Sequence, residues 1–278
     1  MNVSVDSLLF DPSALAIHIA NVLLESTLQT EESRDEVMSR SAVLFLLQDA
    51  PRCAPEEGPR LVLTRRSKNV PQSGDLCCPG GGMENVDRWL AKLVDAPGLM
   101  LRHWPHHEKL PSRTRHAVAT LVATALREEF EEMGIRPWNV RLLGLLPPQS
   151  LRMFRRAIQP VVVSLVGHPH FRPNWEVADI IAIPLRHLLD PSRYARYRLR
   201  FEGDHPGNER LHEDFLCFRA RQGQVLWGAT LRITTLFLEK TFNFTVPSLE
   251  GLPIVQGVLD DAYLSGAPRV GGGTRRRS

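Results

Sequence analysis

Blocks of apolar and polar positions along the first quarter of the chain predict one helix followed by two strands. An aspartate and a proline precede apolar residues at helical spacing, so we expect a helix over about 12–26. The charged segment 29–40 then forms a link. Two short apolar runs, 41–47 and 60–66, flank a segment rich in turn formers, which predicts two strands joined by a long loop.

The rest of the chain continues this alternation of helices and strands. A strongly helical run over 120–133 ends at Gly134, with Pro137 just beyond it. A final helix is predicted over 229–242. Further strands are predicted at 140–146, 160–167 and 179–185, with a strand pair within 197–220. Strands interleaved with helices indicate an α/β or α+β sandwich, and the chain length favours one main domain.

Composition places the chain among ordinary globular proteins, with 43% hydrophobic residues, 23% charged residues and a net charge of +3, which does not demand a nucleic-acid partner. His18 and Asn21 interrupt the apolar run near the N-terminus, and no segment approaches the roughly 18 apolar residues of a membrane helix. The cysteines, at 53, 77, 78 and 217, lack metal-site spacing and are expected to be free thiols. We therefore expect a cytoplasmic protein without a membrane anchor.

Glutamates gather at the end of the helix predicted over 120–133. Because helical residues advance by about 100°, Glu128, Glu131 and Glu132 share one face, while Glu129 lies at the flank, outside this group. The opposite side is predicted to be a buried apolar stripe made of Val122, Leu126, Phe130 and Met133. The acidic face therefore points away from the core.

This crowding of like charge costs free energy. Glutamates three or four residues apart repel by about a few tenths of a kcal/mol per pair, and those in the last turn oppose the helix dipole by about 0.3–1 kcal/mol each. Arg127 can reach Glu131, but one cation does not neutralise three acids. A hard divalent cation would, since Mg²⁺ binds carboxylates together with water and substrate phosphates. The alternative is a solvated acidic helix end without a function.

The glycine-rich segment CPGGGMENVD, at 78–87, lies ahead of this helix. Together the two segments resemble the Nudix box, G-x5-E-x7-R-E-U-x-E-E-x-G-U, in which U is aliphatic. The matching positions are Gly81, Asp87, Arg127, Glu128, Glu131, Glu132, Gly134 and Ile135. Upstream, LVLTRRS at 61–67, Gly74 and CCPGG resemble the coenzyme A pyrophosphatase-like branch of the family, and the similarity extends over about residues 41–240.

The chain departs from the family pattern at several positions. Asp87 stands where the box has glutamate, which is usual in that branch, and Glu129 takes the aliphatic position, so this site is expected to be partly exposed. Between Asp87 and Arg127 lie 39 residues instead of seven, an insertion of 32. Upstream, Gln72 replaces a histidine and Cys78 an aromatic residue, in the stretch that distinguishes coenzyme A cleavers. The resemblance therefore bears least on the identity of the substrate.

The resemblance implies an α/β fold, the Nudix α/β/α sandwich around a mixed β-sheet, and a pyrophosphohydrolase that uses Mg²⁺ or Mn²⁺. The implied substrate is a nucleoside diphosphate linked to another moiety, with coenzyme A or a derivative favoured. The implied metal ligands are Glu128, Glu131 and Glu132, together with a main-chain carbonyl at Gly80 or Gly81, and the two glycines also contact the substrate.

Other residues of the implied site have supporting roles or two interpretations. Arg127 is expected to orient the glutamates by ion pairing, and Asp87 to brace the glycine loop against the helix. Glu176 is either an extra metal ligand or general base, or a structural acid ahead of a strand. Arg65 and Arg66 end a strand close to the glycine turn, where they either bind phosphate or face solvent.

Three parts are expected along the chain. Residues 1–40 form an N-terminal helix and link, and residues 41–245 form the Nudix domain with its insertion at about 88–118. Residues 246–278 form an extension that is disordered from about 265. The insertion is expected either to form a lid or to be an exposed basic loop, and its histidines fit no ligand spacing.

The family also implies a homodimer. Two other functions compete with small-molecule hydrolysis. One is a nucleotide-binding or sensor protein with the same fold and weak catalysis, although no glutamate of the cluster is lost. The other is hydrolysis of RNA 5′ ends, with the arginine-rich tail recruiting RNA, although the body of the protein lacks the aromatic and basic stripe on which single strands stack.

Overall fold

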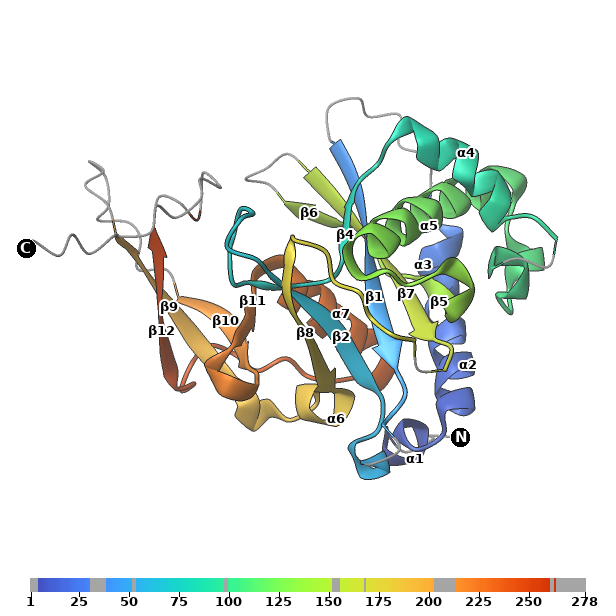
Figure 1. Ribbon diagram of the computed structural model, residues 1–278. Helices are drawn as coiled ribbons and strands as arrows, with labels where there is room; N and C mark the ends of the chain where they lie inside the picture. Colours follow the sequence, from blue (N-terminus) through green and yellow to red (C-terminus); the bar gives the residue numbers. More distant parts are fainter. Residues whose placement is uncertain are drawn as a thin grey trace, which may run out of the picture.

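The computed structural model describes residues 5–30, 39–51, 54–97, 100–151, 156–167, 169–202, 214–260 and 263. Its helices are α1 (Val5–Leu9), α2 (Pro12–Val22), α3 (Leu24–Leu28), α4 (Asn85–Val94), α5 (Ser112–Met133), α6 (Leu185–Leu188) and α7 (Gly228–Phe242) (Figure 1). Short 3₁₀ turns are η1 (Pro55–Glu57), η2 (Met100–His103), η3 (His107–Lys109), η4 (Pro137–Asn139), η6 (Pro191–Arg193) and η8 (Arg221–Gly223). The predicted disorder after about residue 265 lies outside the described ranges.

The strands form two sheets. They are β1 (Ser39–Gln48), β2 (Arg60–Arg66), β3 (Leu76–Cys77), β4 (Gly80–Gly82), β5 (Val140–Leu145), β6 (Gln149–Leu151), β7 (Arg156–Leu165), β8 (Val177–Pro184), β9 (Tyr194–Glu202), β10 (Asp214–Arg219), β11 (Val225–Trp227) and β12 (Ile254–Asp260). The main sheet has the order β3-β2-β1-β7-β5, with β4 paired to β1, β6 to β7 and β8 to β2. Strands β1 and β7 are parallel and the other neighbours antiparallel, so the predicted mixed sheet is confirmed.

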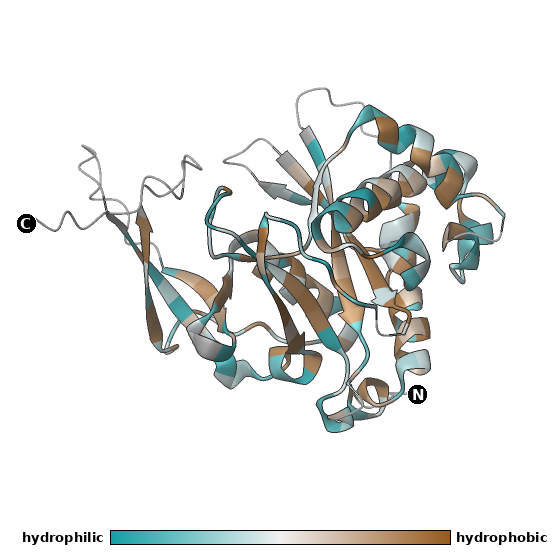
Figure 2. Cartoon of the chain, viewed as in Figure 1, coloured by the Kyte–Doolittle hydropathy of each residue, from teal (hydrophilic) through white to brown (hydrophobic). Residues whose placement is uncertain are grey.

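Strand β1 shows why the run at 41–47 is apolar throughout. Successive side chains of a strand point to opposite faces of the sheet, and both faces of β1 are covered by helices. Ala42, Leu44 and Leu46 belong to the core under α5, whereas Val43, Phe45 and Leu47 belong to the core under α2 and α7. Figure 2 shows the resulting hydrophobic strands between helices whose outer surfaces are more hydrophilic. The expected α/β/α sandwich is therefore confirmed.

The N-terminal helix is interrupted at one residue. The single helix expected over 12–26 is instead α2 and α3, separated by the buried Leu23. Side chains of α3 explain how it is held: the Ser26 hydroxyl donates to the carbonyl of Leu145, and the Thr27 hydroxyl accepts from the Leu145 amide at 2.9 Å. The break thus lets α3 hydrogen-bond to the edge strand β5.

The insertion packs against the body of the protein. It contains most of α4, the turns η2 and η3, and the first turns of α5, so α5 begins well before the predicted residue 120. Trp104 is buried, and its indole nitrogen donates to the carbonyl of Leu143 at 3.0 Å. His107 is buried beside Asp95, with 3.2 Å between the imidazole Nε2 and a carboxylate oxygen. These contacts make the insertion an added layer at the β5 edge.

A smaller sheet was not predicted as a separate unit. It has the order β11-β10-β9-β12, and β12 pairs in parallel with β9 although it falls in the expected C-terminal extension. In Figure 1 this sheet lies on the side of the molecule opposite α4 and α5. No helix within the described ranges combines the length and apolar character that crossing a membrane requires.

Candidate active site

The glycine turn and the acidic end of α5 are in direct contact. A Cβ atom added at Gly81 would lie 2.3 Å from the carboxyl carbon of Glu128, so only glycine allows this approach. Gly80 has φ +146°, and a Cβ atom there would lie 2.4 Å from the carbonyl oxygen of Ala42 on β1. Strand β4 is thereby pressed between β1 and α5, with Glu128 at its surface.

Glu132 joins the same contact. Its carboxylate accepts a hydrogen bond from the backbone amide of Gly80. Burial, together with the negative charges of Glu128 and Glu176, raises the pKa of Glu132 to about 7, and the Gly80 amide opposes this rise. Burial also raises the pKa of Glu128, with further contributions from the charges of Glu131 and Glu84, although Arg127 opposes the change. The two carboxylates therefore lie in a site that disfavours their negative charge.

Glu131 and Glu176 occupy the rim of this site. The Glu131 side chain is 55% exposed, and one carboxylate oxygen lies 3.5 Å from the Arg127 guanidinium. Glu176 lies in the turn ahead of β8, close enough for its charge to raise the pKa of Glu132. Of the three predicted metal ligands, Glu128 and Glu132 therefore meet the glycine turn, while Glu131 faces solvent beside them.

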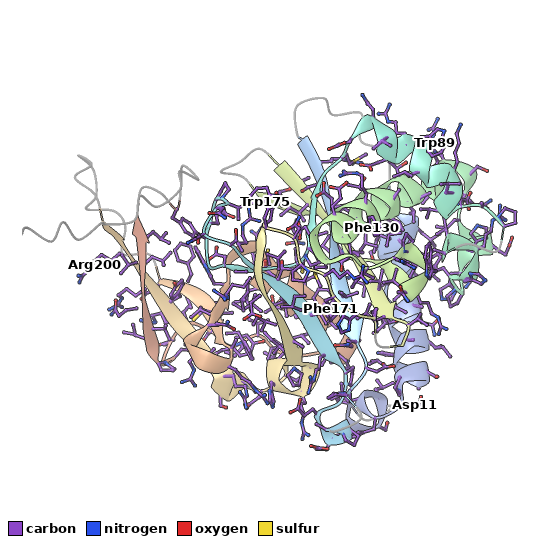
Figure 3. The ribbon with its side chains drawn as sticks, in the orientation of Figure 1. Asp11, Trp89, Phe130, Phe171, Trp175 and Arg200 are labelled. Atoms are coloured by element: carbon purple, nitrogen blue, oxygen red, sulfur yellow. The ribbon has the colours of Figure 1, made fainter. Side chains whose placement is uncertain are left out.

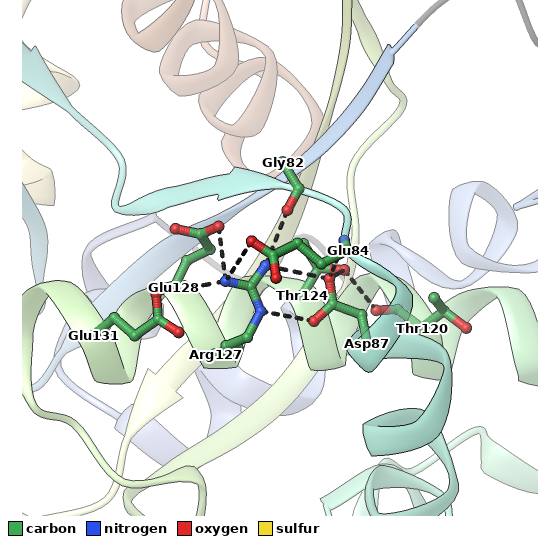
Figure 4. Close-up of polar contacts among 8 residues, drawn as sticks. All are labelled: Gly82, Glu84, Asp87, Thr120, Thr124, Arg127, Glu128 and Glu131. Carbon is green, nitrogen blue, oxygen red and sulfur yellow. Dashed lines mark hydrogen bonds and ion pairs between the residues drawn. The ribbon is translucent and has the colours of Figure 1, made fainter.

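Arg127 joins the loop, α4 and the acidic face (Figure 4). Its Nε donates to Asp87 at 2.8 Å, Nη2 donates to the carbonyl of Gly82 at 3.0 Å, and Nη1 lies 3.1 Å from Glu128. The bond to Asp87 raises the pKa of Arg127, so the guanidinium stays charged. Nη1 also lies 3.8 Å from Glu84, a contact that the sequence did not point to.

Asp87 is fully buried at the start of α4. One oxygen accepts from the Glu84 amide at 2.8 Å and from the Thr124 hydroxyl at 2.9 Å, in addition to the bonds from Arg127. Burial alone would raise the pKa of Asp87, but the hydrogen bonds from Arg127, Glu84 and Thr124 together lower it. These are the contacts of a residue that braces the loop against α5. Thr124 could have been found from the sequence, because it lies one helical turn before Arg127.

The two adjacent arginines of β2 differ. Arg65 lies 3.7 Å from Asp179 on the neighbouring strand β8. Arg66 donates through Nε to the carbonyl of Pro71 at 2.7 Å, and its charge opposes the rise in the pKa of Glu132. Because neighbouring residues of a strand point to opposite faces, the two side chains lie on different faces of β2, and of the two only Arg66 affects the pKa of Glu132 through its charge.

The position of Glu129 was predicted wrongly. It was placed at a partly exposed flank, yet Glu129 is fully buried, and neither carboxylate oxygen has a hydrogen-bond partner among the described residues. Burial, with the charge of Glu132, raises the pKa of Glu129 to about 8. The buried stripe of α5 runs from Leu126 to Glu129 and then to Met133. These steps of three and four residues follow the helical repeat.

The position of Phe130 was wrong for the same reason. It was placed in the buried stripe after Val122 and Leu126, but repeated steps of four residues drift by about 40° each around a helix. Phe130 is 53% exposed, and Figure 3 shows it on the outer side of α5. An apolar residue is thus exposed and an acidic one buried, against the usual preference of both.

The side chains at this site suit a hard divalent cation in the chemistry of their donors. Carboxylate oxygens of Glu128, Glu131 and Glu132 and carbonyl oxygens of the glycine turn are the ligands that Mg²⁺ prefers. Burial, and then the charges of neighbouring carboxylates, raise the pKa of Glu128 and of Glu132, and a bound cation would favour their charged forms. Among the described residues, no three His, Cys, Asp or Glu side chains are already grouped closely enough to hold a metal ion.

Comparison with known proteins identifies the family. The Nudix hydrolase NudL of Pectobacterium atrosepticum is 31% identical over 178 residues, which cover 63% of this chain and 71% of that protein. NudL of Enterobacter sp. strain 638 is 26% identical over 209 residues, covering 74% of this chain and 85% of the relative. The chain belongs to the Nudix hydrolase family. No family model matches the chain.

Family membership confirms the predicted class of enzyme. Nudix hydrolases cleave pyrophosphate bonds and generally use divalent metal ions, so this chain is a Nudix pyrophosphohydrolase. A solved structure of a Nudix hydrolase from Nitrosomonas europaea is similar over 79% of this chain and 78% of its own, with a TM-score of 0.37 and 13% identity.

Proposed function

We propose that this Nudix hydrolase cleaves the diphosphate of a nucleoside diphosphate that is linked to a second moiety, with Mg²⁺ or Mn²⁺ as cofactor. The observation that supports this most directly is the contact of Glu128 and Glu132 with the glycine turn at Gly80 and Gly81. These two segments are separated by the insertion in the sequence, and they meet nevertheless. Coenzyme A or a derivative is the first candidate substrate, because of the upstream resemblance at 61–67.

The acidic face of α5 and the glycine turn would together hold the cation. Glu128, Glu131 and Glu132 would hold the cation, with a carbonyl oxygen of the glycine turn at Gly81. When bound, the cation would neutralise the diphosphate charge and lower the pKa of a coordinated water. Arg127 holds Glu128 in place through its contact at 3.1 Å, and Asp87 fixes Arg127 in turn.

Two further residues act on the substrate and on the attacking water. Arg66, whose charge acts on Glu132, contacts a phosphate of the substrate, where it balances the developing negative charge. Glu176 accepts the proton that the water loses as its oxygen bonds to phosphorus. The bridging oxygen then leaves on the other phosphate, so the products are two phosphate monoesters.

The test is a substrate screen with a matched pair of variants. Coenzyme A, ADP-ribose, NADH and dinucleoside polyphosphates are incubated with the full chain in Mg²⁺, Mn²⁺ or chelator, and phosphate-containing products are measured. We expect hydrolysis of at least one compound, lost in chelator. Glu132→Gln should reduce turnover by about a hundredfold. Glu239→Gln, an exposed position on α7, is the control and should retain full turnover.

Two results would contradict the proposal. One is undiminished hydrolysis by Glu132→Gln, and the other is hydrolysis that persists in chelator. A melting temperature of Glu132→Gln close to that of the unaltered protein shows that lost turnover reflects the site and not the fold.

A further inference from the structure

A four-residue turn stands at the rim of the active site, from Asn174 to Val177. The Val177 amide donates to the carbonyl of Asn174 at 3.3 Å, so Trp175 and Glu176 occupy the two central positions. The side-chain oxygen of Asn174 also accepts from the Glu176 amide at 2.8 Å. Asparagine at the first position stabilises turns in this way. The backbone of the two central residues is therefore held by local hydrogen bonds.

The same turn is tied to the catalytic elements on both sides. On one side the Asn174 amide donates to the carbonyl of Glu132 at 2.9 Å, and the Arg172 amide donates to the carbonyl of Met133 at 2.7 Å. On the other side the Ser67 amide, just after β2, donates to the carbonyl of Glu176 at 2.7 Å. Trp175 thus sits on a turn that bridges the acidic end of α5 and the end of the strand that carries Arg66.

Trp175 is nevertheless 63% exposed. Single exposed apolar residues are common and need no explanation in themselves. Among the described residues, however, no ring or guanidinium lies against the Trp175 indole, whereas Trp138, which is 71% exposed, has Arg136 at 5.5 Å from its ring centre. Figure 3 shows Trp175 at the end of β8 nearest the glycine turn, well away from Trp89 on the insertion.

We propose that the indole of Trp175 is the surface on which the nucleobase of the substrate stacks, an inference that rests on the proposed function. A nucleoside diphosphate has an anionic part, which fits the glycine turn and Arg66, and a planar aromatic part that gains from an aromatic partner. Stacking accepts any base, because every base has an aromatic face. Because hydrogen bonds hold the backbone of this turn beside the acidic site, the indole offers this contact without reordering of the backbone.

Binding of a nucleotide and of its base-free counterpart tests this platform. AMP and ribose 5-phosphate differ only by the base, and their dissociation constants are measured by calorimetry on the full chain with Mg²⁺. We expect Trp175→Ala to weaken AMP binding by about tenfold or more and ribose 5-phosphate binding by less than about twofold. Trp175→Phe should retain most of the AMP affinity, since phenylalanine also stacks.

Trp138→Ala is the matched control, because this tryptophan is as exposed but lies after α5, away from the turn, and it should leave AMP binding unchanged. Equal AMP affinity in the Trp175→Ala variant and the unaltered protein would refute the platform. So would a Trp175→Ala variant that loses the same affinity for AMP and for ribose 5-phosphate, or an unaltered protein that does not bind AMP. The substrate screen decides the proposed function separately. If the protein hydrolyses a diphosphate substrate but Trp175→Ala affects AMP and ribose 5-phosphate binding equally, the stacking proposal is refuted and the proposed function stands.

Discussion

At the scale of single residues, Glu129 is the least expected feature of the molecule. The family pattern has an aliphatic residue at this position, and the structure buries the glutamate without a hydrogen-bond partner among the described residues. The pKa of Glu129, raised to about 8 by burial and the charge of Glu132, lets the side chain stay neutral near pH 7. A buried carboxyl without a partner still loses its hydrogen bonds to water.

We therefore expect Glu129→Leu to stabilise the protein. Leucine restores an apolar side chain of similar size, and the cost of an unsatisfied buried polar group is about 1–3 kcal/mol. The free energy of unfolding, measured in urea without metal, should rise by about this amount. Glu239→Leu, on the exposed side of α7, is the control and should change stability little. A loss of stability in Glu129→Leu would mean that the carboxyl has a stabilising partner.

At the scale of elements, the junction of α4 with α5 depends on Asp87. The sequence placed this residue in the box, but its full burial and its bonds to Arg127 and Thr124 follow from the packing of the insertion. The junction positions the catalytic helix relative to the glycine loop. Its stability should depend on pH, because the pKa of Asp87 is lower in the folded protein than in the unfolded chain.

The sign of this dependence follows from the direction of the shift. A carboxyl whose pKa is lowered by folding contributes stability at pH values above its unfolded pKa of about 3.9, and the contribution disappears as pH falls through the folded value. Asp87→Asn should cost roughly 1.5–3 kcal/mol near pH 7, the range for a hydrogen bond to a charged group. In urea unfolding from pH 7 to pH 3, the difference between the two proteins should shrink as pH falls. A difference that stays constant would exclude the carboxylate as its origin.

At the scale of the whole molecule, Asp75 joins the main sheet to the smaller sheet. It precedes β3, and its carboxylate accepts from the Tyr263 hydroxyl at 2.6 Å and from the Trp227 indole at 3.2 Å. The Gln72 amide also donates to the carbonyl of Tyr263 at 3.3 Å. Tyr263, which follows β12, thereby contacts the loop that follows Arg66, so the smaller sheet and this loop of the main sheet share a boundary.

Tyr263→Phe should weaken this joint. The variant removes one donor from a largely buried carboxylate, which should lower the free energy of unfolding by roughly 1–2 kcal/mol. Hydrogen exchange measured by mass spectrometry should show faster exchange in the loop at 67–75 and in β12, with α4 and α5 unchanged. Uniform acceleration across all peptides would show that the bond supports global stability and not this joint.

Local patterns of the sequence were sufficient to predict the central helices and strands and to identify the residues of the Nudix box. The glycine turn, the glutamates of α5 and the cap at Gly134 are read from residue type and spacing, because helical and strand periodicity act over a few neighbouring residues. The resemblance to the Nudix box implied the mixed sheet between helices, which the structure confirms, and the family, which a relative at 31% identity confirms.

The tertiary structure decided what depends on segments distant in the chain. It buried Glu129 and exposed Phe130, placed Arg65 beside Asp179, and paired β12 with β9. Each outcome is set by which surfaces meet when α5, the sheets and the turn before β8 pack together. Sequence spacing defines the faces of an element, but only its neighbours in space determine which face is buried.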